Sequence, residues 1–360
     1  AQHELAPIYA EVNVEVDHNQ IIMQTLKRVA SQHGMKCLLH EKPFAGVNGS
    51  GKHNNWSLTT DTGVNLLEPG NTPHENVQFL LVLSCILKAV DKHAALLRES
   101  AADVGNDHRL GANEAPPAII SVFLGTQLTD VMNQLITTGM ADHSIESEKL
   151  ETGVKSIPEF MRDTTDRNRT SPFAFTGNKF EFRMLGSSAS VASPNVVLNT
   201  AVAEALAQFY KELEGTAPED MESEVHELIK RAIRKHKKVI FNGNGYTDEW
   251  IKEAEQRGLY NLVSTPDALP QFIADKNIEL FTKHSVFTKE EIYSRYEILL
   301  ENYVKTINIE SKTLQEMLTK DFIPAVNGYA AEVAVNANEK KALIEGLATT
   351  AEESLVKELT

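Results

Sequence analysis

The stretch from His40 to Leu58 constrains the fold most strongly, because it joins a flexible loop directly to a strand. Its three glycines can adopt positive φ and let backbone N–H groups approach a ligand closely. From residue 53 onward the side chains alternate with the period of a half-buried strand. The two alternating sets are His53, Asn55 and Ser57 on one face and Asn54, Trp56 and Leu58 on the other. The sequence therefore predicts a binding loop followed by a strand whose polar face can hold ligands.

The same loop also matches the first seven positions of a phosphate-binding P-loop, from Gly46 to Lys52. A P-loop needs Ser or Thr at the eighth position to bind Mg²⁺, and a helix must follow at once. Here His53 occupies that position and opens a strand-like segment. The mismatch argues against a true P-loop and leaves a tight turn between two strands as the plainer alternative.

The composition is that of a globular protein without a general affinity for polyanions. Of 360 residues, 42% are hydrophobic, which is enough to fill a sizeable core. The net charge of −15 argues against nucleic-acid and anionic-membrane binding. No uncharged apolar stretch of about 18 residues occurs, so no membrane partner is expected. Cys37 and Cys85 lie in apolar runs, which predicts buried free thiols in a reducing cytoplasm.

The first hundred residues show both strand and helix patterns. Tyr9–Val16 alternates like a strand, and Asp17–Gly34 has the spacing of an amphipathic helix that ends at its glycine. Cys37–Leu39 is predicted to be a short buried strand. Thr72-Pro-His-Glu75 is a capping box, which predicts that a long core helix begins there and runs to Leu97.

A second strand with alternating character is predicted at Lys179–Leu185. Its charged side chains face either solvent or a site, and for a strand taken alone solvent is the commoner environment. The charged face carries Lys179, Glu181 and Arg183, and the apolar face carries Phe180, Phe182 and Met184.

Helical patterns dominate from Ser193 onward. The basic residues between positions 230 and 238 lie near a helix C-terminus, where cations suit the helix dipole. We interpret them as a solvated helix end rather than a nucleic-acid patch, given the negative net charge. The predicted helices are Asn195–Leu213, Met221–Lys237, Asp248–Arg257 with Thr247 as its cap, Lys289–Ile307, and most of the chain from Lys312 onward.

The polar faces and loops together indicate a metal-assisted phosphoryl-transfer site. Glu4, His53 and Glu181 are candidate metal ligands, and carboxylates with one imidazole suit Mg²⁺ or Mn²⁺ better than structural zinc. Arginines near a metal neutralise charge on a transferring phosphoryl group. The candidate cations are Arg109, Arg169, Lys179 and Arg183, and Glu114 is a loop carboxylate that could accept a proton.

Four motifs, in this order, resemble those of the glutamine synthetases. Asn48-Gly-Ser-Gly-Lys-His-Asn-Asn-Trp-Ser-Leu58 resembles that family's glycine loop with its metal histidine, and Asn113-Glu-Ala-Pro116 resembles its glutamate flap. Asn168-Arg169 and Glu181-Phe-Arg183 resemble its phosphate-arginine and Glu-x-Arg motifs. The motifs are most similar to those of type III members.

The resemblance implies an α+β fold in which a curved antiparallel sheet, a half-barrel, is flanked by helices. It implies a catalytic domain over residues 1–215 and a long helical C-terminal region over residues 216–360 that packs on it. It further implies ATP-dependent ligation of glutamate and ammonia to glutamine through γ-glutamyl phosphate, with Mg²⁺ or Mn²⁺ as cofactor.

Residue roles follow from the same resemblance. His53 and Glu181 would hold the metal that assists phosphoryl transfer, and Glu4 would bind the neighbouring metal. The glycines of the first loop would then shape a pocket for the amino-acid substrate. Asn48 and Gly49 would contact glutamate, Arg109 its α-carboxylate and Arg183 its reacting carboxylate.

The remaining roles concern ATP, the phosphoryl group and ammonia. Arg169 would stabilise the transferred phosphoryl group. Glu114 would close the site and take a proton from ammonium, and Ser57 and Lys179 would lie towards ATP. Burial of the acyl phosphate under the flap would protect it from water.

Two positions depart from the family pattern, and some expected parts are missing. Asn55 stands where many members have a second histidine, and Ala174 stands where an arginine is expected, so the ATP contacts differ from the family pattern at these positions. The small N-terminal β-domain, the glutamate ligands upstream of Glu4 and the ammonium-binding aspartate have no counterpart in the sequence. The chain thus resembles a catalytic C-terminal portion truncated at both ends, and residues 1–360 alone are expected not to make glutamine.

Three alternatives remain open at the level of sequence. The first is a γ-glutamyl ligase that uses another amine in place of ammonia. The second is a phosphotransferase with the same half-barrel sheet, such as a guanidino kinase, although the flap glutamate argues against it. The third treats the helical half as an assembly module. The family resemblance itself implies large homo-oligomers of stacked rings with sites between subunits.

Overall fold

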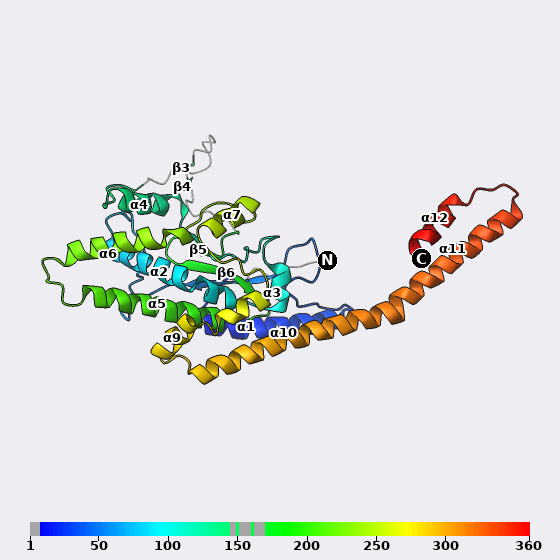
Figure 1. The fold of residues 1–360 in the computed structure, drawn as a ribbon, viewed down its shortest axis with the longest axis horizontal. Helices are drawn as coiled ribbons and strands as arrows, with labels where there is room; N and C mark the ends of the chain where they lie inside the picture. The colour runs from blue at the N-terminus through cyan, green and yellow to red at the C-terminus, as the bar shows by residue number, and fades with distance from the viewer. Residues whose placement is uncertain (1–7, 145–148, 151–159, 162–169) are drawn as a thin grey trace. The chain divides into compact units, whose positions relative to one another are not determined.

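The computed structural model describes residues 8–144, 149–150, 160–161 and 170–360 and divides into two compact units, Ala1–Leu299 and Leu300–Thr360. The α+β class is confirmed, with a small sheet among many helices (Figure 1). None of the helices in the described ranges is both long and apolar enough to cross a membrane. The elements are α1 (Val12–Gln32), β1 (Gly51–Trp56), α2 (Val77–Glu99), α3 (Val104–Arg109), β2 (Val122–Phe123), α4 (Gly125–Thr137), β3 (Lys149–Leu150), β4 (Phe160–Met161), β5 (Phe173–Phe175), β6 (Phe180–Gly186), α5 (Ala192–Leu213), α6 (Met221–His236), η1 (Lys237–Val239), α7 (Asp248–Gln256), α8 (Thr265–Ala268), η2 (Leu269–Gln271), α9 (Asp275–Lys283), α10 (Lys289–Met317), η3 (Leu318–Phe322), α11 (Ile323–Leu343) and α12 (Thr350–Leu359).

The central sheet has the strand order β1-β6-β5-β2. β1 pairs antiparallel with β6, and β6 with β5, as expected, whereas the short strand β2 runs parallel to β5, so the sheet is mixed. The register places Asn55 opposite Glu181 and Trp56 opposite Phe180. The charged face of β6 therefore lies beside the polar face of β1, which favours a site over plain solvent exposure.

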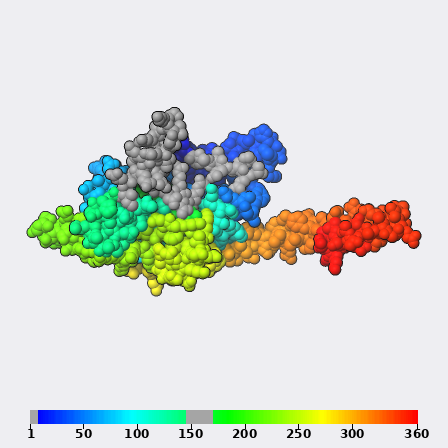
Figure 2. Space-filling model, turned by 90° about the horizontal axis from the view of Figure 1, so that it is seen from above, coloured from blue at the N-terminus to red at the C-terminus, as the bar shows by residue number. Residues whose placement is uncertain are grey.

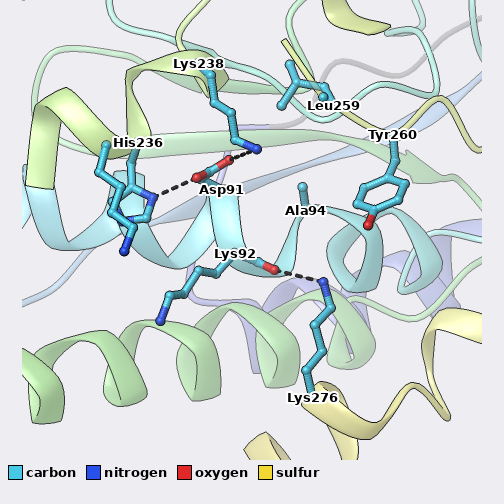
Figure 3. Close-up of a pocket in the computed structure, with 10 residues that line it drawn as sticks. Asp91, Lys92, Ala94, His236, Lys238, Leu259, Tyr260 and Lys276 are labelled. Atoms are coloured by element: carbon cyan, nitrogen blue, oxygen red, sulfur yellow. Dashed lines mark hydrogen bonds and ion pairs between the residues drawn. The ribbon is translucent and has the colours of Figure 1, made fainter. Parts of the chain in front are cut away.

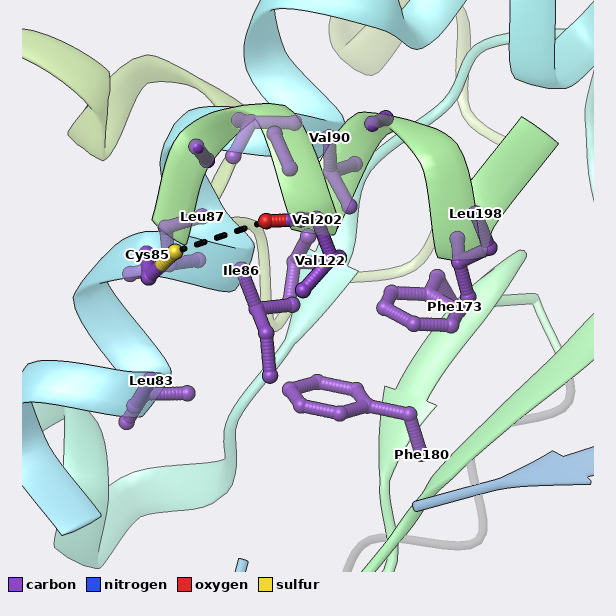
Figure 4. Close-up of a cluster of buried hydrophobic side chains, with 14 of the residues drawn as sticks. Leu83, Cys85, Ile86, Leu87, Val90, Val122, Phe173, Phe180, Leu198 and Val202 are labelled. Carbon is purple, nitrogen blue, oxygen red and sulfur yellow. Dashed lines mark hydrogen bonds between the residues drawn. The ribbon is translucent and has the colours of Figure 1, made fainter. Parts of the chain in front are cut away.

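Helices α2, α5 and α6 pack against one another and bury the aromatic side of the sheet (Figure 4). Phe173 and Phe180 stack with their ring centroids 4.5 Å apart, and both are fully buried. Burial of a side chain of this size contributes about 1.5–3 kcal/mol. Because successive side chains of a strand point to opposite faces, this packing fixes Glu181 and Arg183 on the other side of β6.

A second helix contact, between α4 and α6, lies beside the sheet. α4 packs against α6, and the two lie side by side on the surface (Figure 1 and Figure 2). The side chain of Asn242 accepts hydrogen bonds from the backbone N–H groups of Leu124 and Gly125, at 3.0 and 3.2 Å, and so holds the start of α4. The segment before α7 thus anchors α4 through Asn242, and Thr247 caps α7 as expected.

The long core helix begins later than the capping box predicts. The Asn76 side chain accepts a hydrogen bond from Phe79 N at 3.0 Å and caps α2, while Thr72 belongs to a turn closed by a bond from Glu75 N to its carbonyl. Asn is as good an N-cap as Thr, so the capping-box residues alone do not fix the boundary. The helix itself is confirmed and extends to Glu99, with a kink at His93.

The strand predicted at Tyr9–Val16 is wrong, because α1 begins at Val12 and continues through the predicted helix. Val12 and Val16 are four residues apart and satisfy the helical period as well as the strand period. The bond from Glu15 N to Glu11 O, at 2.9 Å, belongs to the first helical turn. The strand predicted at Cys37–Leu39 is also wrong, since this segment is in no strand and Leu38 is 66% exposed.

Both cysteines are free thiols, but only Cys85 is fully buried, and Cys37 is partly exposed. Burial raises the pKa of the Cys85 thiol to about 12, and its Sγ contacts the Val202 carbonyl oxygen at 3.9 Å (Figure 4). Cys85 therefore acts as a small apolar core residue.

The unit Leu300–Thr360 is helical, as the sequence predicts for the chain from Lys312 onward. Between α10 and α11 the helix takes the π form at η3, just before Pro324 in the first turn of α11. Proline has no N–H to continue the helical ladder, which explains the change at this point. α12 packs on α11, where Lys340 Nζ lies 2.7 Å from Glu352 Oε1.

The helices predicted between residues 193 and 307 are confirmed as α5, α6, α7 and the first part of α10. α6 packs on α2, α4 and α5 inside the unit Ala1–Leu299. The division into domains 1–215 and 216–360 stays a prediction.

Candidate functional site

The polar faces of β1 and β6 bring His53, Glu181 and Arg183 into direct contact. His53 Nδ1 lies 2.8 Å from Glu181 Oε1, and the second carboxylate oxygen accepts from Arg183 Nε at 2.8 Å and pairs with Nη2 at 2.7 Å. The pairing of β1 with β6 is irregular between Lys52 and Asn54, so His53 lies at a bulge. Bulges re-aim side chains and are frequent beside active sites.

The opposite face of β1 is anchored to α5, which fixes the strand beneath this cluster. Asn54 Nδ2 donates to Asn195 Oδ1 at 2.7 Å, and Trp56 Nε1 donates to Asn199 Oδ1 at 2.8 Å. Asn54 and Trp56 are buried while His53 and Asn55 are exposed, so the predicted alternation of β1 is confirmed.

Glu181 is electrostatically suited to hold a cation. Burial opposes its ionisation, but the hydrogen bond with His53 and the charge of Arg183 outweigh burial and lower the Glu181 pKa to about 2. One carboxylate and one imidazole, with the remaining positions left to water or substrate phosphates, fit the coordination habits of Mg²⁺ and Mn²⁺. In the described part of the chain, no group of three or more His, Cys, Asp or Glu side chains is close enough together to hold a metal by itself.

The glycines of the first loop are needed mainly because other groups fill the space beside them. Only Gly46 has positive φ, at 76°, which corrects the expectation for Gly49 and Gly51. A Cβ at Gly51 would overlap the Arg109 guanidinium, and one at Gly49 would lie 2.6 Å from the Glu41 carbonyl oxygen. The loop therefore wraps around Arg109 and the chain at Glu41.

Arg109, predicted to contact the substrate α-carboxylate, is the last residue of α3 and is only 3% exposed. Its Nη1 donates to Asn106 Oδ1 and to the Met184 carbonyl, both at 3.1 Å, and its Nη2 donates to the Arg183 carbonyl at 3.2 Å. Burial lowers the Arg109 pKa to about 10, against the opposing charge of Glu41, so the side chain stays cationic at neutral pH. These contacts tie Arg109 to the end of β6.

Glu41 is a site residue that sequence reasoning missed. It is 2% exposed, and its Oε1 accepts hydrogen bonds from both the backbone N–H, at 2.8 Å, and the hydroxyl of Ser188. Its backbone carbonyl accepts from Ser50 N at 2.7 Å. A Cβ at Gly105 or Gly186 would lie 2.6 or 2.9 Å from the Glu41 side chain. One carboxylate therefore joins the glycine loop, α3 and the turn after β6.

The predicted flap contains two consecutive left-handed residues, Asn113 at φ 51° and Glu114 at φ 69°. Non-glycine residues in this region are strained and often mark functional loops. The Tyr246 phenol is hydrogen-bonded to the Glu114 backbone, and burial raises the Tyr246 pKa. Tyr246 was not singled out by the sequence, because it follows the flap by more than a hundred residues.

The two residues predicted to lie towards ATP belong to one network at the other end of β1 and β6. Ser57 Oγ donates to Asn65 Oδ1 at 2.7 Å, and Asn65 Nδ2 donates to the Asn178 carbonyl at 2.8 Å. Lys179 Nζ lies 3.3 Å from Asn178 Oδ1. By contrast Lys52, the lysine of the P-loop alternative, donates to the Ala189 carbonyl at 2.6 Å, which agrees with rejection of that alternative.

The remaining positions singled out from the sequence are Glu4, Arg169, Asn48 and Ala174. Glu4 and Arg169 lie outside the described residues. Asn48 lies in the exposed loop before β1. Ala174, which stands where an arginine was expected, is fully buried in β5 opposite Glu181.

Two family models match the chain. The model described as glutamine synthetase, catalytic domain, matches residues 1–117, and the model described as glutamine synthetase C-terminal domain matches residues 224–341. The two matches agree in family and come from opposite ends of the chain.

Curated relatives match over nearly the whole chain. A glutamine synthetase of Butyrivibrio fibrisolvens is 49% identical over 100% of this chain and 51% of its own length. A type-3 glutamine synthetase of Dictyostelium discoideum is 49% identical over 94% of the chain and 46% of its own length, and a glutamine synthetase of Bacteroides fragilis is 43% identical over 91% and 46%. The chain thus spans about half the length of these relatives. It belongs to the glutamine synthetase family and is similar to the type III members.

Proposed function

We propose that this chain supplies part of an active site that ligates glutamate and ammonia to glutamine with ATP, through γ-glutamyl phosphate. The observation that carries the proposal is the contact of His53, Glu181 and Arg183 on two adjacent strands. The family matches support the same reaction.

In this proposal Arg183 binds the reacting carboxylate of the substrate glutamate. The Glu181 side chain holds the Arg183 guanidinium in place. The glutamate carboxylate attacks the γ-phosphate of ATP and releases ADP. Ammonia then attacks the carbonyl carbon of the acyl phosphate, loses a proton and displaces inorganic phosphate. Asn48 and Gly49 line the amino-acid pocket, and Arg109 braces it and supplies positive charge for the α-carboxylate. Ser57 and Lys179 lie towards the nucleotide, and Arg169 would bind the phosphoryl group.

His53 and Glu181 would hold Mg²⁺ or Mn²⁺ on this face, and Glu4 would bind a neighbouring ion. The metal supplies charge neutralisation for the transferring phosphoryl group. Glu114, exposed on the strained flap, would accept a proton from ammonium, and closure of the flap would exclude water.

The same proposal extends to assembly and location. We propose that the complete protein works in the cytoplasm as a homo-oligomer of stacked rings, with sites completed between subunits. The free thiols Cys37 and Cys85 fit a reducing compartment.

The test is glutamine formation by the complete protein with glutamate, ATP and ammonia. Arg183→Gln is expected to lower kcat/KM by about 100-fold or more, because a preorganised donor to the developing charge is lost. Lys252→Gln, which removes an exposed charge on α7, is the matched control and is expected to retain full activity. Equal activity of Arg183→Gln and the control would overturn the proposal.

Comparison of ammonia with another amine as substrate tests the alternative function. Under saturating glutamate and ATP, ammonia is expected to give a higher kcat/KM than methylamine. Glu114→Ala is expected to reduce the ammonia-dependent rate, because the proton acceptor is removed. A clear preference for methylamine would favour a γ-glutamyl ligase for another amine.

A further inference from the structure

A hollow of about 360 Å³ lies among the helices of the unit Ala1–Leu299, and no residue of β1 or β6 lines it (Figure 3). It is formed by the middle of α2, the end of α6, η1, the turn after α7 and the start of α9. None of its lining residues belongs to the candidate active site. Its volume lies within the range typical of small-molecule sites.

The floor of the hollow is a buried pair of side chains, His236 and Asp91. His236 Nδ1 lies 2.7 Å from Asp91 Oδ2, and these side chains are only 4% and 7% exposed. Lys238 Nζ lies 3.4 Å from the other oxygen of Asp91. Asp91 is the only acidic residue of the lining, and its charge is already engaged by these two partners.

Three further lysines surround the hollow without a carboxylate partner. Lys276 Nζ donates to the Lys92 carbonyl at 3.2 Å, and Lys92 Nζ donates to Gln208 Oε1 at 3.3 Å, so both acceptors are neutral (Figure 3). Among the described residues, none of Lys92, Lys235 and Lys276 forms an ion pair. A concave surface lined by charges of one sign concentrates counter-ions, and this one is positive in a chain of net charge −15.

The positive charge around the hollow also affects the pKa of the neighbouring Lys88. Burial lowers the pKa of Lys88, and the charges of Lys92 and Lys235 lower it further, against the opposing effect of Glu212. The sequence interpretation of residues 230–238 as a solvated helix end therefore needs an addition. His236 and Lys238 turn inward to Asp91, and Lys235 stands at the rim.

We propose that this hollow binds a phosphorylated small molecule. Lysine binds phosphate as a compact point charge, and four of the lining residues are lysines. Lys92, Lys235 and Lys276 bind the phosphate oxygens. Leu259 and the half-exposed ring of Tyr260 form an apolar wall for the rest of the ligand.

Inorganic pyrophosphate is the probe, and calorimetric titration of the full chain is the measurement. We expect saturable binding that weakens as NaCl is raised. Lys235→Gln and Lys276→Gln are each expected to weaken binding by about fivefold, the upper range for a partly exposed ion pair. Lys235→Arg and Lys276→Arg are expected to retain most of the affinity. Lys252→Gln removes a lysine from the same unit but outside the hollow, and is expected to bind like the parent chain.

Four results would overturn the proposal. The first is no saturable binding, and the second is equal weakening by Lys252→Gln, which would indicate a general charge effect. The third is loss of binding in Arg183→Gln with full binding in Lys235→Gln and Lys276→Gln, which would place pyrophosphate at the candidate active site. The fourth is citrate binding as tightly as pyrophosphate at the same lysines, which would reject phosphate as the class. Circular dichroism of each variant establishes that a lost affinity does not reflect unfolding.

Discussion

Glu41 accepts two hydrogen bonds from Ser188, a residue 147 positions further along the chain. This contact attaches the entry of the glycine loop to the turn that follows β6. Glu41→Ala is expected to lower the free energy of unfolding by about 1–3 kcal/mol, because it removes a buried side chain together with the two hydrogen bonds that it accepts from Ser188. It is also expected to raise KM for glutamate more than it lowers kcat. Denaturant unfolding and steady-state kinetics measure the two effects, and an unchanged unfolding midpoint would contradict the first.

Gly51 contacts Arg109 so closely that any side chain must displace the guanidinium. Gly51→Ala is therefore expected to destabilise the chain by about 1–3 kcal/mol through overpacking and to weaken glutamate binding. Gly328→Ala is the matched control, since a Cβ there meets nothing within 4 Å and the residue lies inside α11. The control is expected to gain about 0.5–1 kcal/mol from helix propensity. Thermal unfolding of both variants tests the contrast, which fails if both shift the midpoint in the same direction.

Glu99, in α2, gives the stability a distinctive pH dependence. Burial raises its pKa to about 8, with a smaller opposing effect of Arg98. Between about pH 4.5 and pH 8 the folded chain therefore holds a proton that the unfolded chain has released, so stability falls as pH rises across this window. Glu99→Gln is expected to remove that slope and to stabilise the chain at pH 8 relative to the parent. Urea titrations at pH 5 and pH 8 measure it, with exposed Glu255→Gln as the control that should keep the parental slope.

Tyr246 connects the flap to the scaffold through the backbone of Glu114. Tyr246→Phe removes only the hydroxyl, and is expected to lower kcat for glutamine formation by about fivefold, the effect of one lost hydrogen bond of roughly 1 kcal/mol. KM for ATP is expected to stay the same, because the substitution leaves untouched the network around Ser57, which we propose to lie towards the nucleotide. Tyr293→Phe on α10 serves as the control. A drop in thermal stability without a change in kcat would assign Tyr246 a structural role only.

The sequence predicts the part of the site that depends on strand periodicity. The alternation at residues 53–58 and 179–185 predicts a polar face with His53, Glu181 and Arg183, and the contacts among these side chains agree with it, although burial along β6 does not alternate. It does not indicate that the two strands are neighbours; only the family motifs imply that. The assigned roles of the site residues remain predictions.

Other features depend on partners that are distant in the chain. Glu41 stands between two ordinary polar residues, and its burial follows from contacts with Ser188 and from the charge of Arg109. The only local signal was its position at the start of the glycine loop. The strand prediction at Tyr9–Val16 was wrong for a different reason. Its valines fit both the strand period and the helix period, and α1 has no buried residue that would decide between them.

The glycine loop leaves little freedom for evolution or redesign. Side chains cannot be added at positions 49 and 51, because the Glu41 carbonyl and the Arg109 guanidinium occupy that space. Exposed positions lie between and before them, at Val47, Asn48 and Ser50. A library that aims to alter the amino-acid substrate should therefore vary these three residues and keep both glycines fixed, since substrate range can change there without disturbing the packing beneath.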